Sequence, residues 1–148
     1  MYKRILIAID GSDTSDRALR EAIGLAKDQQ AMLRIVYAID EISINTEPEF
    51  VNPEDIAAIW AKSGIEILDK AKNLAHTEGI HAETRLIEID ELGVWIAGAI
   101  LEDAKTWSAD LVVAGTHGRR GLTHLFLGSV AEDIVRHCPV PVLLVRTR

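Results

Sequence analysis

The chain has 148 residues and a formal net charge of −7, and 48% of its residues are hydrophobic while only 5% are aromatic. This size suits one domain over residues 1–148, with a single core of aliphatic side chains, because two domains of ordinary size need more residues. The acidic charge argues against nucleic acid or an anionic membrane as the main partner, and the lack of a long apolar run or signal-peptide pattern predicts a cytoplasmic protein.

The first part of the chain alternates between strand and helix patterns. Its opening run ILIAI is typical of a strand that is buried on both faces of a sheet. In chain order, the patterns predict a strand in residues 1–10, a helix capped by Ser12 or Thr14, a strand at 31–39, a loop at 41–52 and a helix from Pro53 to about Ala75. Both predicted strands end on an aspartate, at Asp10 and Asp40.

The second part of the chain continues this alternation. The patterns predict a strand at 81–89, a helix at 92–108, a strand at 109–114, a helix at 129–137 and a strand at 141–145. We expect Trp95, Ile96 and Ala99 on the buried side of the helix at 92–108. Alternating strands and helices imply right-handed crossovers, so we predict an open, largely parallel sheet with helices on both faces.

A glycine-rich stretch, GTHGRRGLTHLFLGSVAE, runs from Gly115 to Glu132 between the fourth predicted strand and the last helix. Gly115 and Gly118 lack a Cβ, which allows positive φ angles and a close approach of backbone N–H groups to a phosphate, and Gly128 can do the same. We expect Ser129 to be the N-cap, with Glu132 completing a capping box. The start of a helix also carries a partial positive charge that favours phosphate oxygens.

A connection of this kind can also be purely structural. The chain lacks the G-x-x-x-x-G-K-[ST] phosphate loop, and its first strand leads into DGSDTS rather than G-x-G-x-x-G. Arg119 could neutralise a phosphate or point into solvent. His117 could transfer a proton, but we expect a solvated loop histidine, because the sequence offers it no evident acid partner. The residues alone leave an anion or nucleotide site and a structural loop as alternatives.

The segment AGTHGRRGLTHLFLGSVAEDIVRHCPVPVLLVR resembles the C-terminal signature of the universal stress protein family, whose nucleotide-binding members carry G-x2-G-x9-G-[ST]. Gly115, Gly118, Gly128 and Ser129 match that spacing. The N-terminal ILIAIDGSDTSDRALREA resembles the opening strand and helix of the same family. The resemblance implies an adenine nucleotide alpha hydrolase-like fold, which is a three-layer open sandwich around a five-stranded parallel sheet of order 3-2-1-4-5.

The resemblance also implies a nucleotide site. The family acid matched by Asp10 lies against the adenosine, the position matched by Ala38 lies against the adenine, and the glycine motif surrounds the ribose and phosphates. The matching positions are Ala8, Ile9, Asp10, Ala38, Ala114, Gly115, Thr116, His117, Gly118, Arg119, Gly128, Ser129 and Val130. Ala114 stands where the family often has Met, which we expect to open the pocket slightly. We expect no catalytic residue and no metal-binding cluster.

These implications give a leading hypothesis and two alternatives. The leading hypothesis is a homodimeric, ATP-binding universal stress protein that acts as a nucleotide-responsive regulator or sensor, with Mg2+ arriving on the triphosphate. Its short apolar strand at Val140–Val145 is predicted to pair with its own copy across a two-fold axis. The alternatives are a slow ATPase or phosphotransferase, in which His117 or Asp10 polarises water, and a nucleotide-free interaction module that binds a protein through Glu41–Asn52.

Overall fold

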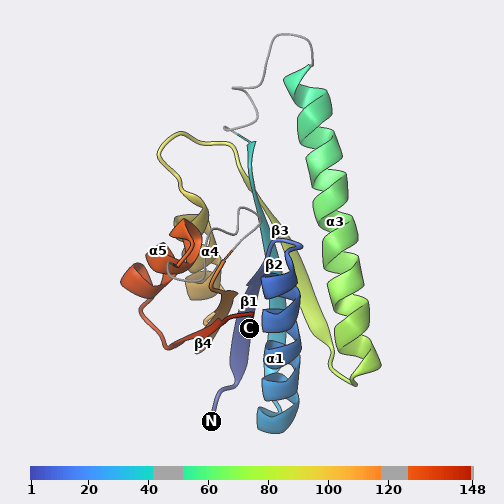
Figure 1. Ribbon diagram of the computed structural model, residues 1–148, viewed down its shortest axis with the longest axis vertical. Coiled ribbons are helices and arrows are strands. Elements are labelled where there is room, and N and C mark those ends of the chain that lie inside the picture. Colours follow the sequence, from blue (N-terminus) through green and yellow to red (C-terminus); the bar gives the residue numbers. More distant parts are fainter. Residues whose placement is uncertain (42–51, 118–126, 148) are drawn as a thin grey trace.

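A parallel β-sheet with helices on both faces organises the computed structural model, which describes residues 1–41, 52–117 and 127–147 (Figure 1). Its strands are β1 (Arg4–Ile9), β2 (Met32–Asp40), β3 (Ala82–Ile89), β4 (Leu111–Gly115) and β5 (Val142–Val145). The five strands lie in the order β3-β2-β1-β4-β5, and each neighbouring pair is parallel. The predicted fold class is therefore confirmed, including the strand order that the family resemblance implied.

The helices of the described residues form the two outer layers. They are α1 (Asp13–Gln29), α3 (Pro53–Thr77), α4 (Ile96–Thr106) and α5 (Ser129–His137). On one face α1 packs on β1 and β4 while α3 packs on β2 and β3, and on the other face α4 and α5 lie side by side (Figure 1). None of the helices in this described part is both long and apolar enough to cross a membrane. The predicted loop at residues 41–52 lies almost wholly outside the described residues.

The central strand β1 is buried on both of its faces. Ile5, Leu6 and Ile7 are each fully buried, with 0% exposure. Ile5 and Ile7 join the hydrophobic cluster beneath α1 and α3, whereas Leu6 joins the cluster beneath α4 and α5, because successive strand residues point to opposite faces. Burying each such side chain contributes about 1.5–3 kcal/mol. The continuous apolar run of the sequence therefore serves two cores at once.

The start of α1 follows the prediction. Ser12 is the N-cap, and its Oγ accepts a hydrogen bond from the backbone N–H of Ser15 at 3.2 Å. Asp13 and Asp16 occupy the first turn, where negative charge interacts favourably with the helix dipole. The helix ends at Gln30, which takes a left-handed conformation with a φ of 54°. This first helix therefore has a fixed beginning at the carboxyl end of β1.

The start of α4 differs from the prediction. The helix begins at Ile96 rather than near Leu92, and Gly93 has a φ of 86°, which interrupts helical geometry. Trp95 is the extended N-cap residue and is 51% exposed, so the prediction that it faces the core was wrong. Its ring lies on Gly98, where an added Cβ would meet the indole at 3.0 Å, and forms an edge-to-face contact with His137 of α5 at 6.1 Å between ring centroids.

Candidate functional site

The described residues of the predicted site meet mainly at the carboxyl ends of β1 and β4, in the middle of the sheet. These strands are neighbours, and Ala8 is the register partner of Ala114. The chain passes from β1 to β2 and β3 on one side and then crosses to β4 on the other, so the winding direction reverses between β1 and β4. Open α/β sheets bind ligands outside the strand ends at such a point. The topology therefore provides a suitable location for a ligand.

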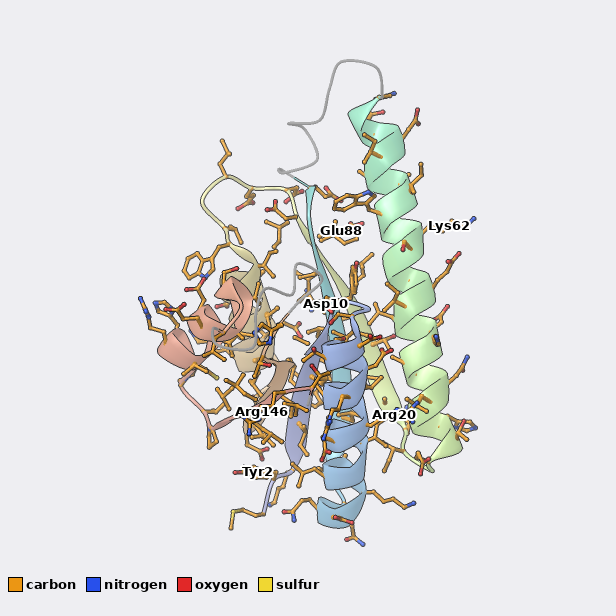
Figure 2. All side chains as sticks on the ribbon, viewed as in Figure 1. Tyr2, Asp10, Arg20, Lys62, Glu88 and Arg146 are labelled. Atoms are coloured by element: carbon orange, nitrogen blue, oxygen red, sulfur yellow. The ribbon has the colours of Figure 1, made fainter. Side chains whose placement is uncertain are left out.

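Asp10 organises the turn between β1 and α1. Its Oδ1 accepts a hydrogen bond from the backbone N–H of Ser12 at 2.9 Å, and its own backbone N–H donates to Ser15 Oγ at 3.0 Å. Figure 2 shows Asp10 beside the start of α1. These bonds fix its carboxylate at the end of β1. Asp10 thus has a structural role in the turn, whatever its role toward a ligand.

Gly115, at the end of β4, is required for close packing rather than for an unusual φ. An added Cβ would come within 2.9 Å of Thr14 Cγ2 and 3.3 Å of the Thr14 carbonyl carbon. The glycines with positive φ among the described residues are Gly11, Gly79 and Gly93, so Gly115 does not use the positive φ that its missing Cβ allows. The absence of a side chain instead lets β4 lie directly against the first turn of α1.

Thr116 joins the end of β4 to both β5 and α5. Its backbone N–H donates to the carbonyl oxygen of Val145 at 2.9 Å, and its own carbonyl oxygen accepts from the N–H of Gly128 at 2.7 Å. The residue is only 8% exposed. These two bonds hold the beginning of α5 next to the end of β4. They bring Thr116 and Gly128, which lie near opposite ends of the glycine motif in the sequence, into direct contact.

The start of α5 lacks the predicted capping box. Gly128 is the N-cap, with an extended backbone at φ −63° and ψ 156°, and Ser129 is the first helical residue. No side-chain hydrogen bond caps this end, and Glu132 instead accepts from Arg136 at 2.8 Å. Gly128 likewise does not use the positive φ that its missing Cβ allows. Because the first N–H groups of a helix lack partners within it, this uncapped start offers hydrogen-bond donors to a ligand.

His117 is not the solvated histidine that we expected. Its Nδ1 lies 3.0 Å from Thr116 Oγ1. Its Nε2 is buried and has no hydrogen-bond partner, the one such side-chain atom found among the described residues. No local sequence pattern signals this state, because it arises from the placement of the neighbouring Thr116 in the fold.

The remaining predicted residues that the structure describes are mainly small and apolar. Ala8, Ala38, Ala114 and Val130 all pack with the cluster on the α4 and α5 face, where Ala114 is 5% exposed. Ile9 points to the opposite face and is 7% exposed. Gly118 and Arg119 lie outside the described residues. Residues 1–41, 52–117 and 127–147 contain no group of three or more histidine, cysteine or acidic side chains that could hold a metal ion.

An open groove of about 460 Å³ lies elsewhere, between the edge strand β3 and α4. It was not predicted, and none of the predicted site residues lines it. Its lining includes Arg85, Trp95 and Asp103, and the Arg85 guanidinium forms an ion pair with the Asp103 carboxylate at 3.1 Å. The groove exists because α4 lies nearer the centre of the sheet and leaves part of β3 uncovered. The charges of Arg85 and Asp103 are paired with one another, which weakens the case for an anionic ligand at Arg85.

Comparison with known proteins agrees with the resemblance found in the sequence. The model of the universal stress protein family matches residues 1–146. The universal stress protein MJ0531 of Methanocaldococcus jannaschii is 37% identical over 146 residues, which cover 99% of this chain and 83% of that protein. The universal stress protein YxiE of Bacillus subtilis is 37% identical over 155 residues, covering 99% of this chain and all of YxiE.

Solved structures of the same family share the fold. A family member from Burkholderia pseudomallei superposes with a TM-score of 0.79 at 32% identity, covering 97% of this chain and 95% of that one. A universal stress protein in complex with cAMP gives 0.69 at 27% identity, covering 99% and 98%. The protein from Archaeoglobus fulgidus in complex with dAMP gives 0.67 at 26% identity, covering 97% and 98%. The family model and the two relatives show that this chain belongs to the universal stress protein family.

Proposed function

We propose that this chain binds an adenine nucleotide between the carboxyl ends of β1 and β4, and that ATP is the ligand. The observation that carries the proposal is the pair of hydrogen bonds at Thr116, which set the uncapped start of α5 beside the end of β4. Backbone N–H groups at such a point suit phosphate oxygens. Related proteins bound to cAMP and dAMP support adenine as the base.

The proposed site divides between adenosine and phosphates. Ala8, Asp10 and Ala38 lie on the β1 and β2 side and would contact the adenosine, while Ile9 would take part through its backbone. The ribose and phosphates would meet the second group, which consists of Ala114, Gly115, Thr116, His117, Gly118, Arg119, Gly128, Ser129 and Val130. Ser129 makes no cap bond, so its hydroxyl is available to a phosphate. The short side chains at both strand ends leave room for a flat base.

Mg2+ fits this site only as a companion of the nucleotide. The described residues hold no group of three or more histidine, cysteine or acidic side chains that could bind the ion. Mg2+ commonly takes most of its ligands from phosphates and water. When bound, it would neutralise charge on a triphosphate. The residues of this chain would then bind and orient the nucleotide through backbone N–H groups and the Ser129 hydroxyl.

The biological role that we propose is nucleotide-responsive regulation by a cytoplasmic homodimer, formed by one domain that spans the chain. The edge strand β5 supports the dimer, because Leu143 is 38% exposed on a strand whose outer side has no neighbour within the described sheet. Antiparallel pairing of two β5 strands would cover this edge. Nucleotide binding near Thr116 would reach the interface directly, since Thr116 bonds to Val145 of β5.

The proposal is tested by calorimetric titration of the nucleotide-stripped protein with ATP and Mg2+, alongside Gly128→Val. The φ of −63° at Gly128 suits any residue, so the substitution keeps the backbone and places a side chain where phosphates would lie. We expect one ATP per chain for the unsubstituted protein and no binding for Gly128→Val. Gly24→Ala is the matched control, because an added Cβ there meets nothing within 4 Å. Equal binding by Gly128→Val would contradict the proposed site, and phosphate release in the same samples measures hydrolysis.

A further inference from the structure

The buried Nε2 of His117 requires an explanation. Buried polar side-chain atoms in folded proteins nearly always have a hydrogen-bond partner, and an unmade bond of this kind costs about 1–3 kcal/mol. Within the described residues, His117 Nε2 is the only buried side-chain nitrogen or oxygen found without a partner. An atom of this kind is expected where a ligand completes the bond.

The contact with Thr116 limits what Nε2 can offer. Thr116 Oγ1 lies 3.0 Å from His117 Nδ1. When the threonine hydroxyl donates to Nδ1, the single ring hydrogen of a neutral imidazole resides on Nε2, which is then a donor. Thr116 itself is held by hydrogen bonds at its N–H and its carbonyl. In this tautomer the imidazole has a neighbour at Nδ1 and an unused N–H at Nε2.

The position of His117 indicates which acceptor would complete this bond. His117 directly follows Thr116, whose carbonyl oxygen accepts from the N–H of Gly128 at the start of α5. The imidazole thus belongs to the same junction as the uncapped N–H groups of that helix. A ligand that meets both Nε2 and these N–H groups is expected to present an anionic oxygen. No carboxylate of the described residues forms an ion pair with His117.

We propose that His117 Nε2 donates a hydrogen bond to a phosphate oxygen of the bound nucleotide and thereby selects nucleoside phosphates over nucleosides. This inference rests on the proposed function and assigns one side chain a role in its specificity. The ring acts as a fixed donor, held by Thr116. The histidine has no part in bond cleavage in this proposal.

The test compares AMP with adenosine, by calorimetry, on the full-length protein and two variants. His117→Asn keeps a polar atom near Nδ1 but removes Nε2, whereas His117→Gln places an amide N–H close to the Nε2 position. We expect His117→Asn to bind AMP about 10- to 100-fold more weakly while its affinity for adenosine is unchanged, as for loss of one hydrogen bond to a charged group. His117→Gln should retain most of the AMP affinity. His76→Asn, on the exposed end of α3, is the matched control.

The outcomes separate this inference from the proposed function. AMP binding by His117→Asn at the affinity of the unsubstituted protein overturns the inference, and so does an equal loss for AMP and adenosine. If the unsubstituted protein binds neither AMP nor adenosine and also fails to bind ATP, the proposed nucleotide function fails and this role fails with it. NMR of the 15N-labelled, unsubstituted protein decides the matter if His117→Asn does not fold. The Nε2 signal of His117 should shift with AMP but not with adenosine, and the reverse result excludes the phosphate contact.

Discussion

The groove between β3 and α4 and the strand ends at β1 and β4 differ in how their polar groups are satisfied. At the groove, the buried Asp103 carboxylate pairs with Arg34 at 3.2 Å and Arg85 at 3.1 Å. At the strand ends, there is an uncapped helix start and an imidazole nitrogen without a partner. The groove has the volume of a ligand site, but the strand ends have the unmet hydrogen bonds. Under the proposed function, the anion would bind where hydrogen bonds are unmet rather than where the cavity volume is large.

The largest expected effect comes from removing Asp103, whose side chain is only 3% exposed. Asp103→Ala leaves the Arg34 guanidinium, 17% exposed, without its buried partner, and we expect the free energy of unfolding to fall by roughly 3 kcal/mol. Urea unfolding measures this loss. Lys27→Met is the control, because its ion pair with Glu78 is long, at 3.9 Å, and exposed, so we expect a change of less than about 1 kcal/mol.

The same Asp103→Ala variant also tests the separation of the two regions. Under conditions in which it remains folded, its ATP affinity should equal that of the unsubstituted protein. A loss of binding in the folded variant would show that the groove and the strand ends act together. It would contradict the independence of the two regions.

A second substitution acts at the strand ends. Gly115→Ala pushes a methyl group to within 2.9 Å of Thr14 Cγ2, and we expect a loss of about 1–3 kcal/mol in stability together with weaker nucleotide binding. Thermal unfolding and calorimetry measure the two effects. Adding Thr14→Ser removes Cγ2 and should recover part of both losses, since the two residues are in direct contact. Equal stability of Gly115→Ala and the unsubstituted protein would rule out close packing as the reason for this glycine.

The two edges of the sheet are expected to differ in their tendency to pair with another strand. The β3 edge carries Glu83, Arg85 and Glu88, which discourage strand pairing, whereas β5 carries the partly exposed Leu143. Leu143→Lys should convert the proposed dimer to a monomer in sedimentation experiments at micromolar concentration. Met32→Lys, which changes a surface residue at 48% exposure on β2, should leave the dimer intact. Identical sedimentation of all three proteins would place the interface elsewhere or exclude a dimer.

The smallest expected effect concerns Glu41, at the end of β2. Partial burial raises the pKa of Glu41 above its ordinary value, and the nearby Glu88 and Asp90 carboxylates raise it further by smaller amounts. A carboxyl whose pKa is raised by folding destabilises the folded protein when it is charged, so this cost disappears as the pH falls through the folded-state pKa. Glu41→Gln should therefore raise the melting temperature slightly at pH 7, and the difference should vanish in acid. A lower melting temperature for Glu41→Gln at pH 7 would contradict this sign.

Much of the fold could be predicted because its strands are short apolar runs, as in β1, and the glycine motif indicated the region of the proposed site. Local patterns failed where tertiary contacts decide the conformation. The spacing of Leu92 and Trp95 suits a buried helix face, but Gly93 interrupts the helix and Gly98 lets the indole lie on the surface of α4. The S-x-x-E pattern at Ser129 also suits a cap, yet the hydrogen bond from Gly128 to Thr116 fixes the extended residue one position earlier.

The contact between Trp95 and His137 gives this protein an internal optical probe. His137 is the last residue of α5, and its ring meets the edge of the indole with their centroids 6.1 Å apart. The other end of α5 is the proposed phosphate-binding end, so a ligand that shifts this short helix would alter the distance between imidazole and indole. The intrinsic fluorescence of the unlabelled protein should then change on nucleotide binding, and Trp95→Phe should abolish that change. Ligands could be screened by this signal without attaching a dye or mutating the site.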